Sequence, residues 1–187
     1  MLAPKVVVVA AQPCSTPNED HGVGVVVLPG FVATAAHVVD GPRRTVTVAG
    51  QPAEVVAIDA RTDLALLATD IAGAFAPTTS TVDGPAIVRT PDGDLPVDVS
   101  DTGQLTVDDT TDHETYEREV HTFAPGVADG TSGSALLDPS GRLAGIVVLA
   151  NRTDDTGYAV TATELWRFVS AVSTGDRAPA APEECPD

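Results

Sequence analysis

The sequence predicts an all-β fold with one short helix near the carboxyl end. Short runs of valine and other aliphatic or β-branched residues recur at intervals of roughly 8 to 12 residues. Turn-forming segments separate these runs, and the chain contains 16 Gly and 15 Pro to supply such turns. Little helical periodicity is found between the runs, which favours a β-sandwich or a β-barrel.

Each apolar run is predicted as a strand, because its length and β-branched content suit an extended segment bounded by turns. In chain order the runs cover residues 5–11, 22–29, 45–50, 53–58, 64–69, 85–90, 104–109, 118–123, 134–138, 143–150 and 157–162. Turn signals occupy residues 40–42, 91–94, 138–141 and 154–157. The acidic stretch 98–119 is expected to form an exposed hairpin with its loop, and its carboxylates lack the spacing of a calcium-binding loop.

A helix is predicted after Thr161. Thr161 and Glu164 have the spacing of a capping box, and Gly175 is expected to end the helix. An apolar stripe between them would face the core, and it consists of Leu165, Phe168, Val169 and Val172. The following segment is rich in proline, alanine and acid, so an irregular tail is expected there unless Cys185 is tied to the body.

The charge of the chain excludes several kinds of partner. It contains 27 Asp and Glu against 10 Lys and Arg, for a formal net charge of −17. Such a surface repels phosphate backbones and anionic lipids, so neither nucleic acid nor a membrane surface is an expected partner. Solubility is the simplest reading of this charge, and a preference for basic substrates is the alternative.

No segment is predicted to span a membrane. The mostly apolar stretch 22–39 is broken by Pro29, by glycines and by His37. The apolar run at the amino end is too short for a secretory signal, so any export signal is expected upstream. Cys14 and Cys185 lie at opposite ends of the chain and belong to no metal-binding motif. From these residues alone, two free thiols and one disulfide both remain open.

Three short segments carry the residues of a nucleophilic hydrolase. They are TAAHVV around His37, TDLALL around Asp63 and GTSGSALL around Ser132. A serine hydroxyl needs a base to activate it, and the base needs an acid to orient it. The order His, Asp, Ser is that of chymotrypsin-like double barrels and not of subtilisins or α/β-hydrolases. Asp59 is a nearby competitor for the acid.

The same segments carry a family resemblance that covers nearly all of residues 5–187. The chain resembles trypsin/chymotrypsin-fold serine proteases, especially bacterial HtrA-type and MarP-type peptidase domains. The resemblance rests on GFVATAAHVV, DARTDLALL, REVHTFAPGVADGTSGSALLDPSGRLAGIVVLA and NRTDDTGYAVTATEL. It implies a single peptidase domain built of two six-stranded antiparallel β-barrels (chymotrypsin-like) with a short C-terminal helix. The polar segment 76–85 would divide a first barrel in 1–80 from a second in 81–160, with the helix and tail in 161–187.

The resemblance also implies roles for individual residues. Ser132 would be the nucleophile, His37 the general base and then acid, and Asp63 the group that orients His37. The backbone N–H groups of Gly130 and Ser132 would form the oxyanion hole. The chain departs from the family pattern at Thr131, Ser134 and Ala135, where Asp or Asn, Gly and Pro are usual. A pseudoprotease that only binds peptides is the main alternative, and an esterase on an unrelated fold is a remoter one.

The primary pocket is also predicted from the resemblance. Gly126, six residues before Ser132, would lie at its base and offer no carboxylate to a basic side chain. The walls would come from Val148, Leu149, Ala150, Gly157, Tyr158 and Ala159. An extended substrate would add as a strand beside 148–151.

Other properties implied by the resemblance are a Cys14–Cys185 disulfide and an extracytoplasmic location. No metal or organic cofactor is expected. His21, His113 and His121 are expected to be exposed or structural rather than catalytic.

Overall fold

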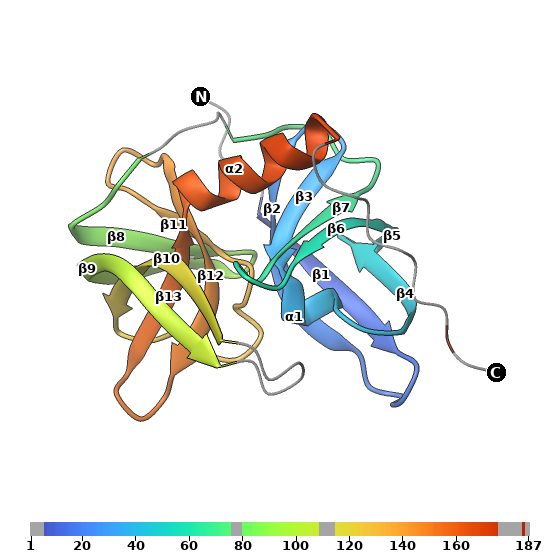
Figure 1. The fold of residues 1–187 in the computed structure, drawn as a ribbon, viewed down its shortest axis with the longest axis horizontal. Coiled ribbons are helices and arrows are strands. Elements are labelled where there is room, and N and C mark those ends of the chain that lie inside the picture. Colours follow the sequence, from blue (N-terminus) through green and yellow to red (C-terminus); the bar gives the residue numbers. More distant parts are fainter. Residues whose placement is uncertain (1–5, 76–79, 109–114, 176–184, 186–187) are drawn as a thin grey trace.

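The computed structural model describes residues 6–75, 80–108, 115–175 and 185. It consists of two antiparallel β units and a C-terminal helix that packs against both (Figure 1). The mostly β character and the single C-terminal helix agree with the sequence prediction. The expected fold class is therefore confirmed, although the two units differ from each other in strand number and closure.

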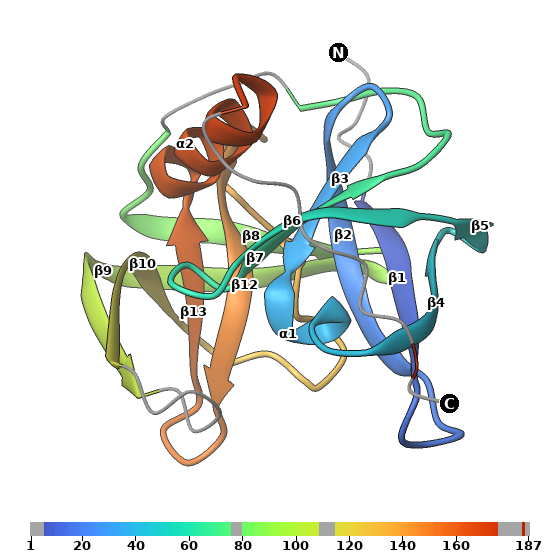
Figure 2. The ribbon, with the colours of Figure 1, turned by 45° about the vertical axis from the view of Figure 1, so that its right-hand side comes forward.

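The first unit is an open sheet of seven strands in the order β5-β4-β1-β2-β3-β7-β6 (Figure 2). Six strands were expected, and the additional one is the two-residue β5. A short helical turn, α1, follows β3 directly. The elements are β1 (Val6–Pro13), β2 (Asp20–Leu28), β3 (Phe31–Ala35), α1 (Ala36–Val39), β4 (Arg43–Val48), β5 (Gln51–Pro52), β6 (Glu54–Asp59) and β7 (Leu64–Ala68).

The second unit is a closed barrel of six strands in the order β10-β13-β12-β11-β8-β9. The acidic stretch predicted as a hairpin forms most of the long β9–β10 pair. The strands are β8 (Gly84–Thr90), β9 (Gly93–Asp108), β10 (Thr115–Ala124), β11 (Ala135–Leu137), β12 (Leu143–Asn151) and β13 (Thr156–Thr161).

The C-terminal helix, α2 (Ala162–Ser173), begins as the sequence predicts but uses only half of the capping box. The Thr161 side chain accepts a hydrogen bond from the Glu164 N–H at 3.4 Å. The Glu164 carboxylate instead accepts hydrogen bonds from Arg61 at 3.1 Å and Arg167 at 2.6 Å. Since Arg61 belongs to the first unit, this ion pair helps to fasten the helix across the two units.

One apolar core connects the two units. It includes valines of the first sheet, Ile146 and Val160 of the second barrel, and Leu165 and Phe168 of α2, all of them buried. Figure 1 shows α2 lying across one end of the molecule, and it packs on β12, β13 and β7. The helix therefore holds the two units in a fixed relation, which matters because the candidate site takes residues from both.

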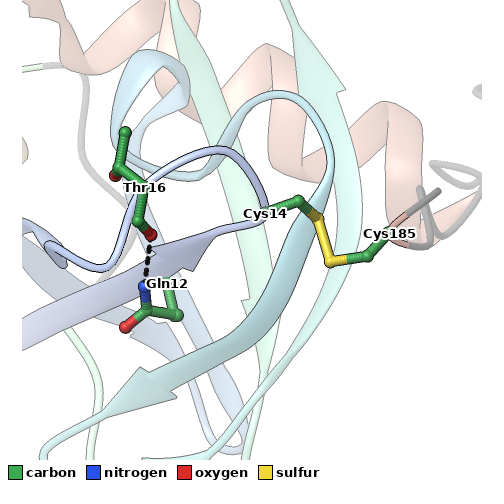
Figure 3. The surroundings of a disulfide bond; sticks show 4 residues. All are labelled: Gln12, Cys14, Thr16 and Cys185. Carbon is green, nitrogen blue, oxygen red and sulfur yellow. Dashed lines mark hydrogen bonds between the residues drawn. A yellow bond between two sulfur atoms is a disulfide. The ribbon is translucent and has the colours of Figure 1, made fainter. Parts of the chain in front are cut away.

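A disulfide joins Cys14, directly after β1, to Cys185 near the carboxyl end (Figure 3). The expected pairing of the two cysteines is therefore present. The bond closes a loop with a sequence separation of 171 residues. Beside it, the Gln12 side chain donates a hydrogen bond to the Thr16 carbonyl at 2.8 Å.

Candidate active site

The pairing of β3 with β7 brings His37 and Asp63 together. Ala35, the last residue of β3, pairs with Leu64, the first residue of β7. In an antiparallel pair, the residues that follow one strand lie beside those that precede the other. His37 lies on α1 just after β3, and Asp63 comes just before β7, so their side chains meet at the same edge of the sheet.

The Asp63 carboxylate holds His37 through both of its oxygens. Oδ2 lies 2.7 Å from the imidazole Nδ1, and Oδ1 accepts the His37 backbone N–H at 2.9 Å. Asp63 has a positive φ of 56°, a conformation that aspartate tolerates better than most residues. The competitor Asp59 is buried at the end of β6, and it is Asp63 that bonds to His37.

The hydrogen bond that His37 donates to the Asp63 carboxylate raises the pKa of His37 above its ordinary value of 6.5. Partial burial and the positive charge of Arg118 oppose this rise. The imidazole remains 49% exposed, so its other nitrogen is accessible to a reacting group. The pair thus provides an oriented base open to the solvent.

Ser132 is fixed against the first sheet by its backbone. Its carbonyl accepts a hydrogen bond from the Val23 N–H at 2.7 Å. The next residue, Gly133, has a φ of 91°, and a Cβ there would lie only 1.7 Å from the Val23 carbonyl oxygen. Only glycine permits this close approach of two backbones. The serine loop of the second barrel is thereby docked beside the strand β2 of the first sheet.

The loop before Ser132 leaves two backbone donors free. The N–H groups of Thr131, Gly133 and Ser134 donate to backbone carbonyls of Ala128, Val147 and Thr131, respectively. The Thr131 hydroxyl also donates to the Ala128 carbonyl at 2.5 Å, a second hydrogen bond within the same loop. Within the described ranges, the N–H groups of Gly130 and Ser132 donate to no protein acceptor. Two neighbouring free donors can bind a developing negative charge.

His37, Asp63 and Ser132 line one cleft with a volume of about 470 Å³. Within the described part of the chain, no hydrogen bond joins the Ser132 hydroxyl to His37, whose imidazole bonds to Asp63. Such contacts are often long before a substrate binds.

The cleft includes only part of the predicted pocket. Val148, Leu149 and Ala150 of β12 line it, whereas Gly126, Gly157, Tyr158 and Ala159 are not among its lining residues. The Gly126 N–H donates to the carbonyl and carboxylate of Asp155, at 2.8 and 3.0 Å. The Phe123 ring packs against Gly157, where an added Cβ would lie 2.2 Å from it. Gly126 and Gly157 thus contact other residues of the second barrel and do not line the cleft.

Several lining residues were not predicted from the sequence. The apolar ones are Val127, Ala128 and Val147, and the charged ones are Asp40 and Arg118. Asp129, directly before Gly130, also lines the cleft. Asp129 forms an ion pair with Arg152 of the β12–β13 turn. For Arg118 a signal was available, because it occupies an inward position of β10, two residues before the buried Val120.

The remaining histidines lie outside this cleft in the parts that the structure describes. His21 is exposed and lies 3.8 Å from Glu19. His121 is fully buried in the second barrel, where its Nδ1 lies 2.6 Å from the Thr102 hydroxyl and burial lowers its pKa. His113 falls outside the described residues. Among the described residues, no cluster of three or more potential ligands could hold a metal ion, and no helix is long and apolar enough to cross a membrane.

Two antiparallel β units with a His–Asp pair and a glycine-flanked serine facing one cleft define a trypsin-like serine peptidase domain. The comparison with known families agrees, since the trypsin-like peptidase domain family matches residues 22–146. The chain belongs to this family.

The similar proteins include mycobacterial and HtrA-type proteases. The serine protease Rv3671c of Mycobacterium tuberculosis is 31% identical over 159 residues, which cover 78% of this chain and 40% of the relative. The chain therefore corresponds to less than half the length of that relative. The crystal structure of the active form of the Rv3671c protease has a TM-score of 0.81 at 28% identity, covering 97% of this chain and 86% of that one. The HtrA-type protease AlgW with a tripeptide is similar in fold, with a TM-score of 0.70 at 21% identity over 92% of this chain and 62% of that one.

Proposed function

We propose that this chain is a serine endopeptidase that hydrolyses peptide bonds through an acyl-enzyme on Ser132. The observation that carries the proposal is the His37–Asp63 pair, bonded at 2.7 Å, in the same cleft as Ser132. Family membership supports the same activity. In this proposal the first unit, an open sheet, supplies the base and its orienting acid, and the second barrel supplies the nucleophile.

In the first half of the reaction, His37 removes the hydroxyl proton of Ser132 as Oγ attacks the scissile carbonyl. Asp63 accepts a hydrogen bond from Nδ1, which leaves Nε2 as the proton acceptor and stabilises the imidazolium that forms. The free N–H groups of Gly130 and Ser132 stabilise the oxyanion. The imidazolium then donates its proton to the leaving amine, and the acyl-enzyme remains.

In the second half, water replaces the amine. His37 takes a proton from the water, the resulting hydroxide equivalent attacks the acyl carbonyl, and the same oxyanion donors stabilise the tetrahedral intermediate. Collapse of this intermediate returns the proton to Ser132 Oγ and releases the acid product. No cofactor takes part in these steps.

The substrate strand would bind to the free edge of β12. The pairing of β11 with β12 ends at Ala135 and Ile146, and beyond this point β12 continues to Asn151 with β13 on its other side. The apolar side chain of Leu149 is 43% exposed there. Backbone hydrogen bonds along 148–151 would hold an extended peptide, as strand addition requires.

We expect a preference for small or medium uncharged residues immediately before the cleaved bond. The cleft walls at Val127, Val147 and Val148 are apolar, and Gly126, expected at the base of the pocket, offers no carboxylate to a basic side chain. Asp129 could attract a basic side chain, but it already forms an ion pair with Arg152. A methylene in such a pocket contributes only about 1–3 kcal/mol, so the preference should be graded rather than absolute.

Cleavage of a mixed peptide library, read by mass spectrometry, measures this preference. Dominant cleavage after Arg or Lys would contradict the pocket assignment. An Arg152→Ala variant provides a comparison, because it frees Asp129 and should increase cleavage after basic residues relative to the wild type.

Activity is expected to fall in acid with an inflection above pH 6.5. The base must be neutral, and the hydrogen bond that His37 donates to Asp63 raises the pKa of His37. The imidazole therefore becomes protonated, and inactive as a base, at a higher pH than an unperturbed histidine would. The pH dependence of kcat/KM for a fluorogenic peptide checks this, and an acid inflection below 6.5 would contradict it.

Labelling by a fluorophosphonate tests the proposed activity without knowledge of the substrate. The probe reacts with an activated serine, so the wild-type protein should be labelled and Ser132→Ala should not. Absence of labelling in correctly folded wild-type protein would favour the pseudoprotease alternative. The disulfide supports an oxidising, extracytoplasmic location for this activity.

A further inference from the structure

Arg118 reaches from the second barrel to the Asp63 loop of the first sheet. It lies on β10, and its side chain is only 8% exposed. Nη2 donates a hydrogen bond to the Ala60 carbonyl at 3.3 Å, three residues before Asp63. Nη1 lies 3.9 Å from Asp63 Oδ2, the oxygen that bonds to the imidazole. A buried charged side chain in this position requires compensating partners, and the Asp63 carboxylate is one of them.

We propose that Arg118 is a positioning residue that acts through Asp63, by anchoring the loop of Asp63 to the second barrel and by placing a buried positive charge behind the carboxylate. The inference rests on the proposed peptidase function. The anchor matters because Asp63 and Ser132 belong to different units. A side chain that ties the Asp63 loop to the barrel of Ser132 helps to fix the geometry between His37 and Ser132.

The charge of Arg118 also counteracts a side effect of Asp63. Asp63 orients the imidazole, but the hydrogen bond that it accepts also raises the pKa of His37. The imidazole is then neutral only above a higher pH. Arg118 lowers that pKa and so offsets part of the rise. Orientation by a carboxylate and basicity near neutral pH are thereby combined at one histidine.

The other charged groups near His37 do not lower its pKa as Arg118 does. Asp20 of β2 raises the pKa of His37, as Asp63 does. Asp40, after α1, and Asp129, before the serine loop, also line the cleft and are acidic. Arg43 forms an ion pair with Asp20 at 2.6 Å, and Arg152 pairs with Asp129. Among the lining residues that the structure describes, Arg118 is the one arginine.

The test is a titration of His37 in Arg118→Gln, a neutral variant whose amide can still donate to the Ala60 carbonyl. We expect the pKa of His37, followed by NMR in a Ser132→Ala background, to rise by about 0.5 to 1 unit. In the active protein, the acid inflection of kcat/KM should move upward by the same amount. Arg118→Lys should give an intermediate shift, because the shorter side chain keeps the charge but holds it farther from Asp63.

Arg89→Met is the matched control. Arg89 lies on β8 of the same barrel and pairs with Asp94, so its removal takes away one positive charge outside the cleft. It should leave the inflection unchanged. An unchanged or lowered pKa of His37 in Arg118→Gln would overturn the proposal, as would Arg118→Lys shifting it as far as Arg118→Gln does.

These measurements distinguish a failure of the Arg118 proposal from a failure of the proposed peptidase function. If Arg118→Gln fails to fold, as judged by circular dichroism, Arg118→Lys decides, and an inflection at the wild-type position overturns the proposal. The NMR titration does not depend on turnover. An unlabelled wild-type protein would contradict the peptidase function, while the titration would still measure the effect of Arg118.

Discussion

Replacing Ser132 with alanine is expected to lower kcat/KM for a peptide substrate by roughly 10⁴- to 10⁶-fold. The loss follows from removing the nucleophile, since the oxyanion donors and the cleft can still bind the substrate and stabilise some charge. His37→Ala should cost about as much, because a serine hydroxyl without a base is a poor nucleophile. The double variant should be little worse than either single one, since the two residues act as a unit.

Asp63→Asn should cost about 10⁴-fold. An amide can present its N–H to Nδ1, which then becomes the acceptor, so Nε2 carries the proton and cannot act as the base. The steady-state rates of the purified variants, measured with one fluorogenic peptide, give these losses directly.

Ser134→Ala is the control for this series. Ser134 lies two residues from Ser132 in the same loop and is fully buried, and its hydroxyl has no hydrogen-bond partner among the described residues. Its removal should leave kcat/KM within a few-fold of the wild type. If Ser132→Ala retained the activity of the wild type while thermal unfolding showed an intact fold, the assignment of the nucleophile would be wrong.

The elements of the fold and the triad candidates could be predicted because their signals are local. A valine-rich run between two turns indicates a strand wherever it lies. The His37, Asp63 and Ser132 segments each carry a short pattern, and their order along the chain adds to it. The predicted strand 22–29 matches β2, but no separate strand was predicted at β3, because the stretch 22–39 is mostly apolar and only Pro29 and Gly30 mark the hairpin. Gly30 adopts a φ of 84° there, which the turn requires.

The pocket and the surroundings of Asp63 depend on contacts between distant segments. Gly126 bonds to Asp155 and Phe123 packs on Gly157, and neither contact has a pattern within its own strand. The proximity of Arg118 to Asp63 requires β10 of the second barrel to face the loop before β7 of the first sheet. Such a relation follows from the packing of two units, which local periodicity does not encode.

Removing the Cys14–Cys185 disulfide is expected to destabilise the protein by several kcal/mol. The bond spans a sequence separation of 171 residues, so it restricts nearly the whole unfolded chain. The chain-entropy account assigns about 5 kcal/mol to a loop of this length, and native disulfides of small secreted domains typically contribute about 2–5 kcal/mol. Because a folded domain has only about 5–15 kcal/mol of stability, this bond is a large fraction of it.

Urea unfolding of the wild type, with and without reductant, measures the contribution. A Cys14→Ser/Cys185→Ser variant should match the reduced wild type, and reductant should have no effect on it, which separates the disulfide from other effects of the reagent. Alkylation followed by intact-mass measurement should find no free thiol before reduction and two afterwards. Two alkylated thiols in unreduced protein from an oxidising compartment would contradict the pairing and remove its support for an extracytoplasmic location. Equal urea midpoints with and without reductant, in protein whose reduction is verified by intact mass, would contradict the expected contribution of the disulfide to stability.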